Sequence, residues 1–176
     1  KIQATSGSLG FGSTAADSLQ EIPRIIEPIK GLMGVVDRSP LGKTGVGKTG
    51  LASGILLKAI QNGYRGLFIR AQDLFDEMYA SLADRATRKL INRLARIDVV
   101  LVDEMGYLNL KPEQTNIFFK LMEERYRQHP TIITTNLDYE EWHNFLGSKE
   151  LVKALLSRIR HQCHTVRIDG PSLRAP

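Results

Sequence analysis

One stretch of eight residues, from position 42 to position 49, constrains the fold of this chain more than any other. It reads Gly-Lys-Thr-Gly-Val-Gly-Lys-Thr and fits G-x-x-x-x-G-K-[ST], the spacing of a loop that wraps the phosphates of a nucleotide. Its glycines let backbone N–H groups approach an anion, because no side chain blocks them. The pattern therefore predicts a P-loop that binds ATP or GTP.

A helix is expected to follow the loop, from Gly50 to Gln61, so that the phosphates lie at the positive end of its dipole. Lys48 would reach the β- and γ-phosphate oxygens, and the Thr49 hydroxyl would hold Mg²⁺. The residues predicted to bind the nucleotide are Gly42, Lys43, Thr44, Gly45, Val46, Gly47, Lys48, Thr49 and Gly50.

The chain before the loop departs from the usual pattern. A P-loop should follow directly on a buried strand, yet the apolar run 32–36 stops at Asp37, and residues 38–41 separate it from Gly42. Pro40 cannot donate a hydrogen bond within a central strand. This strand is therefore expected to end early or to be irregular, and nucleotide binding depends on whether it forms.

Beyond the loop, short apolar runs alternate with amphipathic segments, which predicts a parallel sheet covered by helices on both faces. Strands are expected at 66–70, 99–102, 131–135 and 164–168, and helices at 71–83, 85–96, from 112 onwards, 140–146 and 149–160. Residues 1–30 are expected to form a flexible or atypical lead, and 31–176 a single domain. The predicted fold class is α/β, with three layers and a mainly parallel five-stranded sheet that binds ligands at the carboxyl ends of its strands.

Polar residues follow two of these strands. Asp103 and Glu104 come directly after the run 99–102, where Asp103 would hold Mg²⁺ through water and Glu104 would orient and deprotonate the attacking water. The alternative is a pair of solvated turn acids. Asn136 follows the strand 131–135 and would bind the γ-phosphate and the attacking water, or would serve only as a helix cap or turn residue.

The expected helix 85–96 carries a basic face. Its five positive side chains are Arg85, Arg88, Lys89, Arg93 and Arg96. Four of them recur at spacings of four, four and three residues, and no acidic residue lies between them. Together with the net charge of +5 and the pI of 9.4, the stripe predicts contacts to DNA phosphates with little preference for base sequence. A solvated amphipathic helix is the alternative.

Arg158 lies on the last expected helix. It could present its guanidinium to the γ-phosphate of a neighbouring subunit, which would couple hydrolysis to assembly. Taken alone, however, an arginine in this position is more typical of a surface residue in a local ion pair.

From about position 42 to position 174 the chain resembles the IstB-like branch of the AAA+ ATPases, which are relatives of the DnaC helicase loaders. The resemblance rests on blocks that occur in the family's order: GKTGLA at 47–52, DEMGYL at 103–108, TTNL at 134–137, ALLSR at 154–158 and DGPSLR at 169–174. Together they are far more specific than any one of them.

The resemblance implies an AAA+ fold and assigns four roles to six residues: Walker A to Lys48 and Thr49, Walker B to Asp103 and Glu104, sensor 1 to Asn136 and a trans-acting arginine finger to Arg158. It also implies an ATP- and Mg²⁺-dependent helper of transposition that oligomerises on double-stranded DNA and acts with a transposase. The alternatives are a DnaC-like helicase loader and a DNA-binding remnant that no longer hydrolyses ATP. A small-molecule kinase is weakened by Glu104, which suits the activation of water better than that of a substrate hydroxyl.

Cysteine content and hydropathy narrow the expected setting. Cys163 is the only cysteine of the 176 residues, so an internal disulfide is impossible and a reducing, cytoplasmic setting is expected. No apolar run approaches the roughly 20 residues that span a bilayer, so no membrane partner is expected. His161, Cys163 and His164 lie too close together to complete a tetrahedral metal site.

Overall fold

The computed structural model of the chain describes residues 2–5, 32–37, 47–126, 128–137, 141–147, 150, 152–155, 157 and 164–168. Its strands are β1 (Ile2–Thr5), β2 (Leu32–Asp37), β3 (Gly66–Arg70), β4 (Val99–Met105), β5 (Thr131–Thr135) and β6 (His164–Ile168). Its helices are α2 (Lys48–Gln61), α3 (Ala71–Ala83), α4 (Thr87–Ala95), α5 (Pro112–Arg125) and α6 (Glu141–Leu146). The described positions 150, 152–155 and 157 are helical too, within the last predicted helix.

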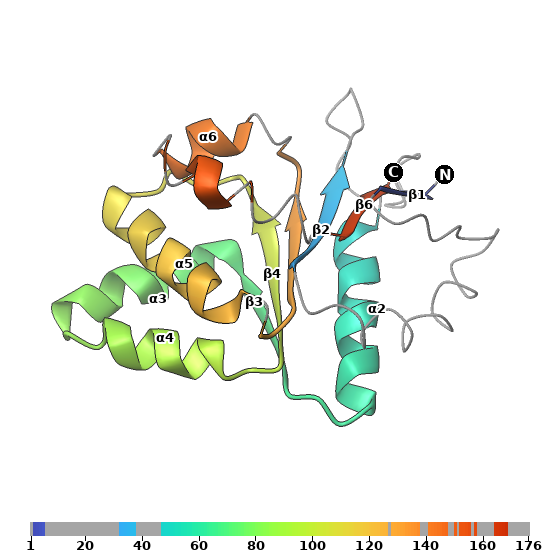
Figure 1. Cartoon of the computed structure of the whole chain (residues 1–176), viewed down its shortest axis with the longest axis horizontal. Coiled ribbons are helices and arrows are strands. Elements are labelled where there is room, and N and C mark those ends of the chain that lie inside the picture. The colour runs from blue at the N-terminus through green and yellow to red at the C-terminus, as the bar shows by residue number, and fades with distance from the viewer. Residues whose placement is uncertain are drawn as a thin grey trace, which may run out of the picture.

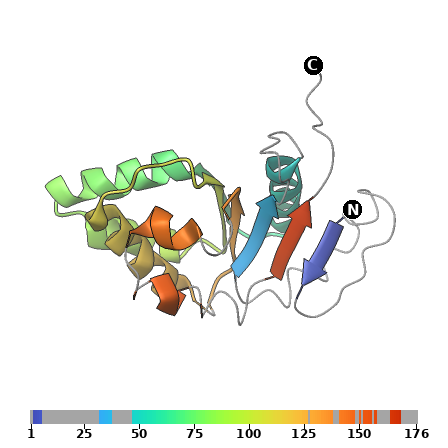
Figure 2. The same cartoon turned by 90° about the horizontal axis from the view of Figure 1, so that it is seen from above.

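The strands form one sheet in the order β1-β6-β2-β5-β4-β3, and Figure 2 shows several of them side by side. The five strands from β6 to β3 are parallel to one another. β1 adds a sixth, antiparallel strand at the edge, so the predicted count of five is one too low. β1 lies within the segment predicted to be a flexible or atypical lead, and its backbone pairs with β6.

β2 occupies the centre of the sheet. It pairs with β5 through Leu32–Val36 and with β6 through Met33–Asp37. The strand whose formation the sequence left open is therefore present, and it ends at Asp37, before Pro40. Since β2 forms, the main reason to expect a remnant without a P-loop strand is removed.

Helices cover both faces of the sheet, as predicted. α2 lies on one face and α3, α4 and α5 lie on the other (Figure 1). The buried residues of α2 are Ala52, Ile55, Leu56 and Ala59, and they pack on the β4, β5 and β6 side chains Val99, Leu101, Ile132 and Val166. The larger core cluster joins α3, α4 and α5 to Val100, Val102 and Ile133. Because β4 is apolar on both faces, it is buried from both sides.

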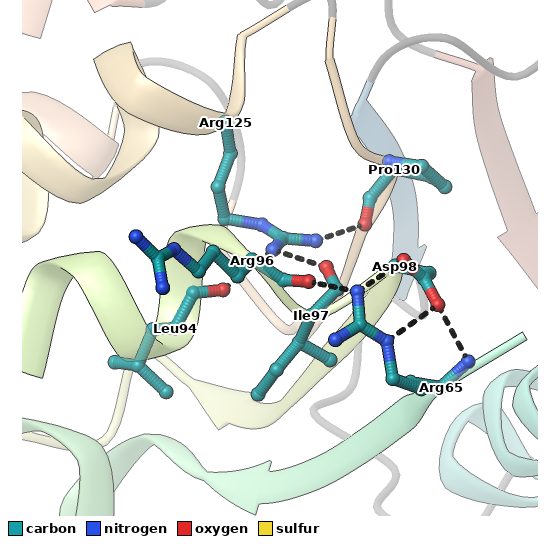
Figure 3. Close-up of polar contacts among 7 residues, drawn as sticks. All are labelled: Arg65, Leu94, Arg96, Ile97, Asp98, Arg125 and Pro130. Atoms are coloured by element: carbon teal, nitrogen blue, oxygen red, sulfur yellow. Dashed lines mark hydrogen bonds and ion pairs between the residues drawn. The ribbon is translucent and has the colours of Figure 1, made fainter.

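Arg125, at the end of α5, fastens the amino-terminal edge of the sheet (Figure 3). Its side chain is only 1% exposed. Nε donates to the Thr131 hydroxyl at 2.8 Å, Nη1 donates to the carbonyls of Leu94 and Ile97 at 2.7 Å each, and Nη2 donates to the carbonyl of Pro130 at 2.6 Å. One guanidinium thus joins the end of α4 to the start of β5.

A second arginine, Arg65, makes hydrogen bonds at the same edge of the sheet, on the side exposed to solvent. Arg65 donates from Nε and Nη2 to the Asp98 carboxylate at 3.0 and 2.9 Å, and from Nη2 to the carbonyl of Arg96 at 2.6 Å (Figure 3). The hydrogen bonds from Arg65 lower the pKa of Asp98 to about 2. Burial lowers the pKa of Arg125 to about 10, partly opposed by the charge of Asp98, so its guanidinium stays charged at neutral pH.

Candidate functional site

A cleft of about 530 Å³ lies at the carboxyl ends of β3, β4 and β5, beside the first turn of α2. Its lining residues are Gly47, Lys48, Thr49, Gly50, Arg70, Gln72, Asp73, Glu104, Tyr107, Leu108, Thr134, Thr135 and Asn136. Both its place at the strand ends and its size are typical of a small-molecule site in an α/β sheet.

The amino end of α2 forms one wall of the cleft. Gly47 precedes the helix with φ 93°, a left-handed conformation that favours glycine. Among the described residues no side chain caps this end, and the first turn of α2 contains no acid. The positive end of the helix dipole therefore meets no competing carboxylate in its own first turn, which suits the binding of phosphate.

Thr49, which lines the cleft, contacts Asp103. The Thr49 hydroxyl donates to the Asp103 carboxylate, at 3.1 Å from each of its oxygens. Asp103 is only 3% exposed. A hydroxyl oxygen that donates its proton keeps its lone pairs, and hydroxyl and carboxylate oxygens are the ligands that Mg²⁺ prefers. These two residues therefore fit the predicted magnesium site.

A bulge brings Glu104 into the same cleft. β4 and β5 are in register at Val102 and Ile133 and again at Met105 and Thr135, so two residues, Asp103 and Glu104, lie opposite one residue, Thr134. In a regular strand two adjacent side chains point to opposite faces. The bulge changes this direction, and Glu104 adopts φ 61° and lines the cleft. Glu104 therefore lines the cleft, and Asp103 contacts the cleft residue Thr49.

Asn136 also lines the cleft, and Gly106 lies next to its side chain. The Asn136 Oδ1 atom is buried and accepts no hydrogen bond within the part of the chain that the structure describes. A Cβ on Gly106, which has φ 123°, would come within 2.6 Å of that oxygen. Because a buried acceptor without a donor costs free energy, the site is suited to a donor such as a bound water.

Several cleft residues were missed by the sequence analysis: Arg70, Gln72, Asp73, Tyr107, Leu108, Thr134 and Thr135. Arg70 ends β3 beside Asp103 of β4, and its Nε lies 3.7 Å from Asp73 Oδ2. Its position at a strand end was the signal that could have identified it. Tyr107 directly follows the bulge and glycine, and it is 61% exposed.

The structure does not bring the predicted DNA-binding residues to the cleft. α4 packs on α3 and α5 and lies away from the carboxyl ends of the strands (Figure 1). All five basic residues are exposed, and Arg93 forms an ion pair with Glu77 of α3. The helix spans Thr87–Ala95, so it is shorter than predicted, and Arg85 and Arg96 flank it.

Other predicted residues lie outside the described part of the chain. They are Gly42, Lys43, Thr44, Gly45, Val46 and Arg158 in the predicted sites, together with His161 and Cys163. Across the described ranges, no helix has the length and apolar character that crossing a membrane requires.

Comparison with known proteins places this site in a family. The family model of IstB-like ATP-binding proteins matches residues 24–176. A protein of Geobacillus stearothermophilus, named as an ATP-binding protein of insertion sequence IS5376, is 33% identical over 93% of this chain and 66% of its own length. The chain spans about half to two thirds of the length of such relatives.

Solved structures with the same fold come from DNA replication. The DnaC helicase loader superposes with a TM-score of 0.68 at 21% identity, over 91% of this chain and 94% of the loader. DnaA bound to AMPPCP and single-stranded DNA superposes with a TM-score of 0.70 at 20% identity, over 92% of this chain and 48% of DnaA. The fold is that of the P-loop AAA+ proteins, and the chain belongs to the family of IstB-like ATP-binding proteins.

Proposed function

We propose that this chain binds ATP with Mg²⁺ in the cleft and hydrolyses it, as the DNA-dependent ATPase of an insertion sequence. One observation carries the proposal: the bulge in β4 brings Glu104 into the cleft that is also lined by Thr49, whose hydroxyl donates to Asp103. A magnesium-binding pair and a carboxylate at the same phosphate site provide what the hydrolysis of a phosphoanhydride requires.

Each side chain has a distinct role in the proposal. Lys48 would bind the β- and γ-phosphates beside the amino end of α2, and Thr49 and Asp103 would hold Mg²⁺, which when bound would neutralise charge on the phosphates. Glu104 accepts a proton from the attacking water, and Asn136 Oδ1 accepts a hydrogen bond from it. The residues Gly42–Val46 complete the phosphate loop, and Arg158 acts on a neighbouring subunit's nucleotide.

The basic face of α4 is the proposed contact to double-stranded DNA, with a transposase as the further partner. Arg88 and Lys89 are exposed, and no acid lies in the first turn of this helix. Arg93, in the last turn of α4, forms an ion pair with Glu77. The positive charge in the first turn of α4 is therefore less neutralised by acidic side chains than that in the last turn. Because α4 lies away from the cleft, DNA binding and ATP binding use separate surfaces of one molecule.

ATP hydrolysis by the purified chain, with and without double-stranded DNA, tests the proposal. Glu104→Gln should lower kcat by about 100-fold or more, because a general base contributes roughly 10²- to 10⁴-fold, while binding of ATP is kept. Glu124→Gln is the matched control, since Glu124 is exposed on α5 away from the cleft. A chain that does not bind ATP, or a Glu104→Gln variant with normal turnover, would contradict the proposed function.

The DNA contact has its own test. Arg88→Ala and Lys89→Ala should each weaken binding to any duplex and reduce the slope of log affinity against log salt by about 1. Lys58→Ala, on α2 across the sheet, removes the same charge and should leave the slope unchanged. Equal losses in all three variants would show that only net charge matters and would exclude α4 as the contact.

A further inference from the structure

A single hydroxyl group joins the two acids of the site. Thr134 lies on β5 opposite the bulge, and its side chain is buried, with 1% exposed. Its hydroxyl donates a hydrogen bond to Asp103 Oδ1. The same oxygen accepts the backbone N–H of Glu104 at 2.9 Å. No other described side chain makes hydrogen bonds to both Asp103 and the backbone of Glu104.

The two bonds fit the capacity of a hydroxyl, which has one proton to donate and two lone pairs to accept with. A bulge leaves the extra residue of the strand without its regular ladder partner. Here the N–H of Glu104 would be that unpaired group, and Thr134 supplies the acceptor. The N–H that the bulge in β4 leaves unpaired is therefore satisfied by a side chain of the neighbouring strand β5.

The direction of each carboxylate depends on these bonds. Glu104 holds a left-handed φ of 61°, which residues other than glycine seldom adopt unless their surroundings require it. Asp103 receives hydroxyl donors from two sides, Thr49 on α2 and Thr134 on β5. Loss of the Thr134 hydroxyl would leave the N–H of Glu104 without an acceptor and Asp103 with one donor fewer.

We propose that Thr134 is a positioning residue for hydrolysis: its hydroxyl holds the bulge so that Asp103 faces Thr49 and Glu104 faces the cleft. This inference rests on the proposed ATPase function. Thr134 acts through the two acids and has no chemical step of its own. It should therefore affect turnover more than it affects the binding of the nucleotide.

Three variants on one strand test the inference. Thr134→Val keeps the shape of the side chain without the hydroxyl and should lower kcat by about 10- to 100-fold, as loss of a supporting hydrogen bond at a metal site does. Its KM for ATP should stay within about 3-fold of wild type. Thr134→Ser keeps the hydroxyl and should restore most of the turnover.

Thr131→Val is the matched control. Thr131 is a threonine of the same strand, also buried at 3% exposure, and its hydroxyl serves Arg125 at the opposite edge. This variant should lower the melting temperature and leave kcat unchanged. A further readout is the hydrogen exchange of the Glu104 amide, which should become at least about 10-fold faster in Thr134→Val and not in Thr134→Ser.

The possible outcomes distinguish a failure of the role of Thr134 from a failure of the proposed ATPase function. Wild-type turnover in Thr134→Val would overturn the inference and leave the ATPase function standing. Equal losses in Thr134→Val and Thr134→Ser would also overturn it, because the hydroxyl that Ser keeps would then give no rescue of turnover. A wild-type chain without hydrolysis would overturn the proposed function and the role of Thr134 together.

Discussion

β5 has a buried threonine near each end, and the two hydroxyl groups have different surroundings. At the amino end the Thr131 hydroxyl meets Arg125, whose three nitrogens all donate to the protein itself. At the carboxyl end the Thr134 hydroxyl meets Asp103 and the backbone of Glu104, beside a left-handed non-glycine residue and the unpaired Asn136 Oδ1. One end satisfies its polar groups internally, whereas the other leaves strain and unused hydrogen-bonding capacity.

This difference indicates which end holds the fold and which end is built for a ligand. Polar groups that are fully paired inside the protein add rigidity but have nothing left to offer a ligand. Strained backbone and an unpaired acceptor persist only where the surrounding structure enforces them, and such features concentrate at functional sites. Changes at the amino edge should therefore reduce stability, and changes at the carboxyl edge should reduce activity.

The largest expected effect is on the amino edge. Arg125→Met should lower the free energy of unfolding by about 3 kcal/mol or more, because it removes a buried charged donor that bonds to the Thr131 hydroxyl and to the carbonyls of Leu94, Ile97 and Pro130. Urea denaturation measures this loss. Arg125→Lys should recover only part of it, since one ammonium lacks the planar fork that reaches all the acceptors. A loss of unfolding free energy below about 1 kcal/mol in Arg125→Met would contradict the view that the amino edge holds the fold.

The second prediction concerns the carboxyl edge. Gly106→Ala would place a Cβ 2.6 Å from Asn136 Oδ1 and 2.7 Å from Leu137 Cγ, at φ 123°. It should lower ATP turnover by about tenfold or more, because small displacements of reacting groups have large effects. The accompanying loss of stability should be about 1–3 kcal/mol.

Gly63→Ala is the control for Gly106→Ala. Gly63 also has a left-handed φ, 88°, but a Cβ there would meet no atom within 4 Å. It carries the backbone strain without the contact, so it should lower stability by about 1–2 kcal/mol and leave turnover unchanged. Thermal unfolding and steady-state kinetics on both variants make the comparison. Equal turnover in the two variants would show that the contact with Asn136 has no role in the site.

The smallest effect is the pH dependence of the amino edge. The pKa of Asp98 in the folded chain, about 2, lies below its ordinary 3.8 because of the hydrogen bonds from Arg65. Ionised Asp98 therefore stabilises the fold above pH 3.8, and this contribution is lost as the pH falls through 3.8 toward about 2. It should be small, since the pair is partly exposed to solvent.

Asp98→Asn should flatten the stability profile in this acid window. Asp84→Asn, at an exposed position after α3, should leave the profile as in wild type. Unfolding curves at a series of pH values from 2 to 5 measure both. A profile for Asp98→Asn that matches wild type would show that the carboxylate contributes no stability in this window.

Much of this architecture was predictable from sequence. The helix after the loop and the strands at 66–70 and 131–135 follow directly from runs of apolar residues with clear boundaries. The placement of Asp103 and Glu104 at the carboxyl end of a strand also holds. Such local patterns are informative because burial selects apolar side chains at fixed spacing.

The rest depended on contacts between distant segments. Period-two alternation gives no sign of the bulge, which requires Thr134, about thirty positions further along the chain, to supply an acceptor. The burial of Arg125 was also hidden, because an arginine in the last turn of a helix usually faces solvent, and its acceptors come from two other segments. β1 is only four residues long and lies in a polar lead, so its pattern was too weak to detect.

Under the proposed function, the bulge also allows folding and hydrolysis to be separated by the deletion of one residue. Because it consists of one extra residue in β4, deletion of Glu104 alone would leave Asp103 as the one residue opposite Thr134, with Met105 still opposite Thr135, and would return the two strands to regular pairing. The shortened chain would keep its sheet, α2 and Asp103 and would lose only the residue that we propose activates water. Under the proposed function, loss of a single codon would thus leave a chain that binds ATP without hydrolysing it.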